Sequence, residues 1–87
     1  MTFDEVYALV KQDLGELNPS EARTTYIKHL MTASIGYMET EGATLPHDSV
    51  VEGTTVPANY TADDASLIIM YTHYLVTKRD TTEAMPR

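Results

Sequence analysis

The longest apolar run in the chain lies between Thr61 and Arg79, and it constrains the fold more than any other feature. From Leu67 to Val76 the sequence reads LIIMYTHYLV, so nearly every side chain is aliphatic, aromatic or a methionine. A run of about ten residues is half of the roughly twenty that a membrane-spanning helix needs. The run therefore predicts a buried helix, and the other segments are expected to pack around it.

Length and composition restrict the class of protein. The chain has 87 residues and no cysteine, with 13 acidic against 6 basic residues and a formal charge of -7. A chain this short supports one hydrophobic core, and without cysteine it has neither a disulfide framework nor a thiolate metal site. The start MTFDEV lacks the basic flank and apolar core of a signal peptide. These features predict a single cytoplasmic domain with no membrane association, and the acidity disfavours tight binding to nucleic acid.

Three helices are predicted, because three sites carry a side-chain acceptor followed three residues later by a carboxylate, which is typical of helix N-termini. The three pairs are Thr2 with Glu5, Asn18 with Glu21, and Thr61 with Asp64. Pro19 suits the first position of a helix, and Gly15 and Gly42 suit helix ends. The expected fold is an all-α bundle of helices at about 3–14, 19–41 and 62–79.

Residues 43–60 form a long connection between the second and third helices. They contain two prolines and a glycine, and a segment of this length is usually functional or mobile. Ser49–Val51 and Thr54–Val56 flank Glu52-Gly53, which is compatible with a short hairpin or with an irregular arm. Both alternatives are open at this point. The expected organisation is one domain over 1–80, with 43–60 as an inserted arm and 81–87 as a flexible tail.

The second and third helices each carry apolar residues on more than one side, which predicts contact with a neighbouring subunit. On the second helix we expect the core face to hold Tyr26, Ile27, Leu30, Ala33, Ser34 and Tyr37; on the third, Leu67, Ile68, Tyr71, Tyr74 and Leu75. The remaining apolar residues are predicted to form the subunit interface: Met31, Ile35, Met38, Ile69 and Val76.

No motif in the chain indicates catalysis or a bound cofactor. His29, His47 and His73 lack the spacing of a zinc site, so no metal is expected. Asp63 and Asp64 fall in the first turn of a predicted helix, where capping explains them better than acid–base chemistry. The glycines are scattered and form no phosphate-binding loop. We expect a protein that is not an enzyme, with its six tyrosines in the core and with Glu39 and Glu41 solvated.

The segment from Ala65 to Arg87 resembles the C-terminal half of the gp6-like head-tail connector proteins of tailed bacteriophages, also called head-completion or adaptor proteins. The discriminating positions are Tyr71, Tyr74, Lys78, Arg79, Asp80, Met85, Pro86 and Arg87. MTFDEVYALVKQDL and YIKHLMTASIGYMETEGATL are similar to the first and second helices of that family. Related chains continue past Met-Pro-Arg into another helical segment and have a shorter connection than 43–60.

The resemblance implies a helical subunit of a closed homo-oligomeric ring in the virion. Such a ring docks beneath the portal protein, contacts a tail-side connector protein and extends the channel for DNA packaging and exit. It is assembled in the host bacterial cytoplasm and has no catalytic role. An acidic lumen repels phosphate, so the genome passes without specific binding. The alternative is a small acidic helical module that binds or regulates a protein partner through its third helix.

Overall fold

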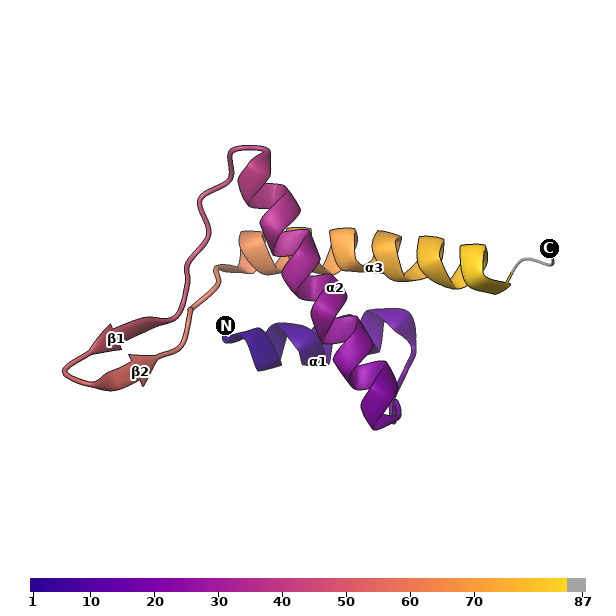
Figure 1. The fold of residues 1–87 in the computed structure, drawn as a ribbon, viewed down its shortest axis with the longest axis horizontal. Helices are drawn as coiled ribbons and strands as arrows, with labels where there is room; N and C mark the ends of the chain where they lie inside the picture. Colours follow the sequence, from indigo (N-terminus) through magenta and orange to yellow (C-terminus); the bar gives the residue numbers. More distant parts are fainter. Residues whose placement is uncertain (85–87) are drawn as a thin grey trace.

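The computed structural model describes residues 1–84, which form a mostly helical fold with a small two-stranded sheet (Figure 1). Its elements, in chain order, are α1 (Phe3–Leu14), α2 (Glu21–Thr40), β1 (Ser49–Val51), β2 (Thr54–Val56) and α3 (Ala62–Ala84). Both α1 and α2 pack against α3, and α2 crosses α3 rather than running alongside it. The helical character is confirmed, whereas the all-α prediction is wrong because the connection contains a sheet.

Two of the three predicted helix starts are confirmed. At α1, Thr2 and Glu5 form a complete capping box, and Gly15 closes the helix in the left-handed conformation with φ of 73°. At α3, the Asp64 amide donates to Thr61 Oγ1 at 3.1 Å. Asp64 therefore lies in a capped first turn, as its position in the sequence predicts.

The end of α1 is confirmed and the end of α2 differs by one residue, whereas the start of α2 and the end of α3 are wrong by two and five residues. The N-cap of α2 is Ser20, whose Oγ accepts a hydrogen bond from the Arg23 amide, rather than Asn18. Serine is as favourable a cap as asparagine, so the helix begins two residues later than predicted. The helix α3 continues to Ala84 instead of ending at Arg79, since no glycine or proline interrupts 80–84. The prediction of a flexible tail is therefore wrong for 81–84, and its last residues, Met85, Pro86 and Arg87, lie outside the described residues.

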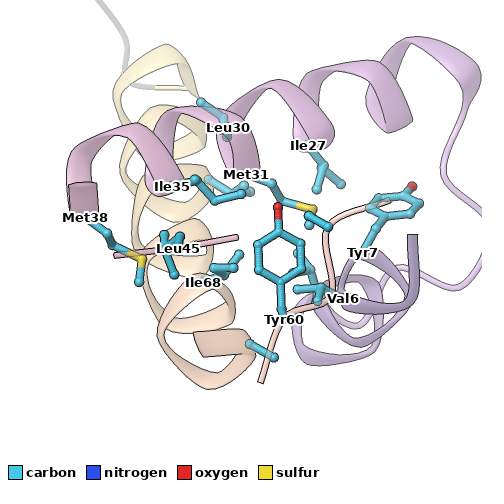
Figure 2. Packing of buried hydrophobic residues seen from close by; sticks show 14 residues of the cluster. Val6, Tyr7, Ile27, Leu30, Met31, Ile35, Met38, Leu45, Tyr60 and Ile68 are labelled. Atoms are coloured by element: carbon cyan, nitrogen blue, oxygen red, sulfur yellow. The ribbon is translucent and has the colours of Figure 1, made fainter. Parts of the chain in front are cut away.

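The hydrophobic core is built from all three helices and from both ends of the long connection (Figure 2). Its buried members are Val6, Tyr7 and Val10 of α1, Ile27, Leu30, Met31, Ile35 and Met38 of α2, Ala65, Ile68 and Val76 of α3, and Leu45, Ala58 and Tyr60 of the connection. The connection thus covers a side of α2 that α1 and α3 leave open. A small chain obtains a larger core this way than three helices alone would give.

A hydrogen-bonded polar pair interrupts the apolar run of α3, and its hydrogen bonds offset most of the cost of burying it. Thr72 is fully buried, and its Oγ1 donates to Ser34 Oγ of α2 at 3.2 Å. The Ser34 hydroxyl in turn donates to the Leu30 carbonyl at 2.9 Å. Since both hydroxyls are hydrogen-bonded, the pair fixes the register of α2 against α3 at little energetic cost.

The connection contains a hairpin rather than an irregular arm, the other structure that the sequence allows. β1 and β2 pair antiparallel with Val51 opposite Thr54. The two turn residues, Glu52 and Gly53, have φ of 52° and 77°. Positive φ at both central residues defines the turn type that matches the natural twist of a two-residue hairpin, and glycine adopts it without strain.

The hairpin is anchored at its base and free at its tip. At the base, the Ala58 amide donates to Asp48 Oδ1 at 2.8 Å, and the Tyr60 amide donates to the Met1 carbonyl at 2.6 Å. All six strand residues are exposed, and the hairpin extends away from the helices at one end of the molecule (Figure 1). We call residues 49–56 the arm.

The molecule is elongated, with principal dimensions of 52 × 30 × 21 Å over the described residues. The arm lies at one end of the longest axis, and the C-terminal part of α3 lies at the other. Within residues 1–84, none of the helices combines the length and the apolarity that a membrane crossing requires.

Candidate functional site

The residues predicted to form a subunit interface are largely inside the chain's own core. Met31, Ile35, Met38 and Val76 are buried, and Ile69 is half-buried against the core. Placing them on an exposed contact surface is therefore wrong. Leu45 and Tyr60 explain much of the difference, because these residues of the connection lie on the same side of α2 as Ile35 and Met31 (Figure 2).

The surface that is left exposed carries residues predicted to be buried. On α3, Leu67, Met70 and Tyr74 follow at intervals of three and four residues, so they share one face of the helix. Tyr37 of α2 is also exposed. Met70 and Tyr74 are each 58% exposed, although the helix around them is among the most apolar parts of the chain. We call Tyr37, Leu67, Met70 and Tyr74 the apolar patch.

A groove between α2 and α3 lies beside this patch. It has a volume of about 380 Å³ and is lined mainly by Ala33, Tyr37, Tyr71, Tyr74, Leu75 and Arg79. The rings of Tyr37 and Tyr71 contact each other across it, with centroids 5.5 Å apart and planes tilted by 56°. The groove is therefore mostly aromatic and aliphatic, with one cation in its lining; we call it the α2–α3 groove.

A second groove, the α1–α3 groove, lies on the other side of Tyr74 and has a volume of about 680 Å³. Asp13 of α1 borders it, and its Oδ2 lies 2.6 Å from Nδ1 of His73 on α3. Lys78 also lines it, with Nζ 5.7 Å from the centre of the Tyr74 ring. This groove is more polar in its lining side chains, and its only α1 residue is Asp13.

Arg23 joins three segments of the chain through ion pairs. Its guanidinium donates two hydrogen bonds to Glu16, each of 2.9 Å, and two to Asp80, of 3.0 and 2.8 Å. Asp80 thus links α3 to α2 through this ion pair. The bonds to Asp80 and Glu16 raise the pKa of Arg23 further above its ordinary value, and the guanidinium holds the pKa of Asp80 below its usual range. The sequence did not reveal this cluster, because Arg23 and Asp80 are 57 residues apart.

Replacing Arg23 with methionine is expected to lower the free energy of unfolding by about 1 kcal/mol at neutral pH, because these carboxylates are partly exposed and screened. Asp80 has a lowered pKa in the folded state, so its contribution is present above its unfolded pKa of about 3.9 and is lost as the pH falls through the lower folded value. Urea denaturation of the native protein and Arg23→Met between pH 7 and pH 2 measures both effects.

The control for this variant is Lys28→Met, which removes a more exposed ion pair with Asp4 of 3.4 Å. We expect Lys28→Met to change the stability by less than about 0.5 kcal/mol. Equal stabilities of Arg23→Met and the native protein at pH 7 would show that the Arg23 cluster contributes nothing to the fold.

Two of the three histidines each pair with one carboxylate, His73 with Asp13 and His47 with Glu39. His47 Nε2 lies 2.6 Å from Glu39 Oε2, which corrects the expectation that Glu39 is simply solvated, and His29 is exposed. Among the described residues, no group of three or more histidine, cysteine, aspartate or glutamate side chains is placed to hold a metal ion.

Comparison with known proteins adds no relatives: no family model matches the sequence, and no curated protein or solved structure is detectably similar to it. The functional assignment therefore depends on the surface of this chain and on the resemblance of its own residue pattern.

Proposed function

We propose that this chain is a structural subunit of a phage head-tail connector, a small helical protein that assembles into a ring beneath the portal and extends the DNA channel. The observation that carries this proposal is the apolar patch together with the arm. Both expose apolar side chains to water, although a chain this short forms only a small hydrophobic core. Exposed apolar surface of this kind marks a protein–protein contact.

The type of contact is suggested by the positions of these two features. The arm lies at one end of the longest axis, and α3 extends to the other. The apolar patch lies between Leu67 and Tyr74 of α3 and at Tyr37 of α2, so it is a different surface from the arm. Two different surfaces favour head-to-tail association, which makes a ring when the rotation between subunits closes. A closed ring of helical subunits is also what the resemblance of α3 to the connector proteins implies.

The net charge supports a channel that does not hold DNA. With a charge of -7, a ring of many copies concentrates negative charge around its axis. Negative charge facing the phosphate backbone opposes tight binding and lets the duplex slide. The proposed role therefore requires neither a base-reading surface nor a catalytic group.

The proposal predicts a concentration-dependent rise in mass. Light scattering of the purified protein, alone and with a portal ring from a tailed phage, is expected to show a closed species of about a dozen copies, and negative-stain images are expected to show rings. Substituting Tyr74 with aspartate should lower the mass while the helical circular dichroism is unchanged, because Tyr74 is exposed. The matched control is Thr81→Asp, an exposed position on the same helix outside the apolar patch.

A protein that stays monomeric when concentrated and in the presence of portal would contradict the connector proposal. A one-to-one complex with a single protein partner through α3 would instead support the alternative, a small acidic binding module. The two classes are therefore separated by the same mass measurement.

A further inference from the structure

We infer that the arm of one copy docks in the α2–α3 groove of a second copy, with Glu52 at the arm tip pairing with Arg79 in the groove. This inference rests on the proposed function, since it names the contact through which the subunits associate.

The arm has a face with two exposed valines, Val51 at 56% and Val56 at 42%. Side chains alternate along a strand, and opposed residues share a face, so Val51 and Val56 lie on the same side of the hairpin. Val50 on the opposite side is 71% exposed. A two-stranded hairpin alone in water is only marginally stable. A surface that packs against the valines would therefore stabilise the arm as well as bury them.

The tip of the arm carries a charge in an unfavourable backbone conformation. Glu52 has φ of 52°, a region that asparagine and glycine occupy much more readily. Glu52 is exposed, and it has no ion-pair partner among the residues that the structure describes. A carboxylate kept at such a position is consistent with a contact that needs the negative charge.

The α2–α3 groove provides the complementary chemistry. Tyr37, Tyr71 and Leu75 supply apolar walls for valine side chains, and Arg79 supplies a cation. Across residues 1–84 the other basic side chains already have contacts: Lys11 and Lys28 with the Tyr7 ring, Arg23 with two carboxylates, and Lys78 with the Tyr74 ring. Arg79 is exposed and has no such contact within that part of the chain. It is the cation available to Glu52 of another copy.

A single copy cannot make this contact with itself. The arm and the C-terminal half of α3 point in opposite directions along an axis of 52 Å (Figure 1). The groove and the arm are different surfaces, so each copy uses its arm on one neighbour and its groove on another. This contact is heterologous and is repeated around a ring.

Charge reversal tests the pairing of Glu52 with Arg79. Glu52→Arg and Arg79→Glu are each expected to weaken self-association about tenfold in sedimentation velocity, because each places like charges at the contact. The double variant Glu52→Arg/Arg79→Glu is expected to restore the native affinity. Lys78→Glu is the matched control: it reverses the neighbouring charge but lies in the α1–α3 groove, and we expect less than about a twofold change.

Crosslinking tests which groove the arm occupies. The native chain has no cysteine, so each variant carries only the introduced thiol. A short bismaleimide is expected to join Val51→Cys protein to Ala33→Cys protein, since Ala33 is exposed in the α2–α3 groove. Val51→Cys mixed with Ser66→Cys is the control, because Ser66 is exposed in the α1–α3 groove. Preferential crosslinking to Ser66→Cys, or rescue of Glu52→Arg by Lys78→Glu, would overturn the choice of groove.

The outcomes for the arm and for the proposed function are separable. Rings that form normally in both single charge variants would overturn the arm contact and leave the connector proposal intact. A native protein that never exceeds monomer mass would contradict the connector proposal. Selective crosslinking of Val51→Cys to Ala33→Cys at millimolar protein would in that case still support the arm contact.

Discussion

Replacing Val76 with aspartate is expected to unfold the protein rather than to separate its subunits. Val76 is 1% exposed and belongs to the core cluster of all three helices. An unpaired carboxylate in such a site costs several kcal/mol. A chain of this length has a total stability of roughly 4–13 kcal/mol, so the variant is expected to lose most of its helical signal. Far-UV circular dichroism at pH 7 and a urea titration measure this loss.

The matched control for Val76→Asp is Thr77→Asp, which introduces the same charge at the next, exposed residue of α3. We expect it to change stability by less than about 0.5 kcal/mol. If the Val76→Asp protein instead stays folded and self-associates less, Val76 lies at a subunit interface. That outcome would contradict the burial described above.

Truncating Ile68 to alanine is expected to reduce the free energy of unfolding by about 3 kcal/mol, within the range for removing a buried isoleucine side chain. Ile68 is fully buried in the core that α3 shares with α2. The truncation removes apolar contacts and leaves a cavity that helices packed from two sides can only partly close. The urea midpoint measures the loss of stability. An unchanged slope of the unfolding free energy against urea concentration shows that the folded and unfolded states keep their compactness.

The adjacent residue provides the comparison for Ile68→Ala. Leu67 is 41% exposed and belongs to the apolar patch, so Leu67→Ala is expected to cost less than about 1 kcal/mol. Similar losses for the two variants would mean that Leu67 is buried as deeply as Ile68 and that the exposed face of α3 is assigned to the wrong residues.

Local signals in the sequence predicted the elements of the fold well. Thr2 with Glu5 and Thr61 with Asp64 identified two helix starts correctly, because a cap depends on residues three positions apart. Glu52-Gly53 between short β-branched segments indicated a hairpin as one of two alternatives. The end of α3 was predicted five residues too early, although no glycine or proline interrupts 80–84.

Helical spacing predicted only part of the core of α2 and α3. On α2 it placed Ile27, Leu30 and Ser34 in the core, and these residues are buried. It also placed Tyr37 there, which is exposed, and it placed the buried Met31, Ile35 and Met38 at a subunit interface. Helical periodicity gives the angle between two apolar faces of a helix, but it does not show which segment packs against each face. On α2 the answer depends on Leu45 and Tyr60, which belong to a segment with no periodicity at all.

The order of the elements, the helix caps, the acidity and the two-residue turn all follow from residues close to one another in the chain, and the sequence contains them. The identity of the exposed surface does not follow from such residues. It depends on how the connection folds back over α2, on the Arg23 cluster that ties α2 to α3, and on the arm that projects from the base formed by Ala58 and Tyr60. These are contacts between distant segments, whose free energies arise only when the whole chain is folded.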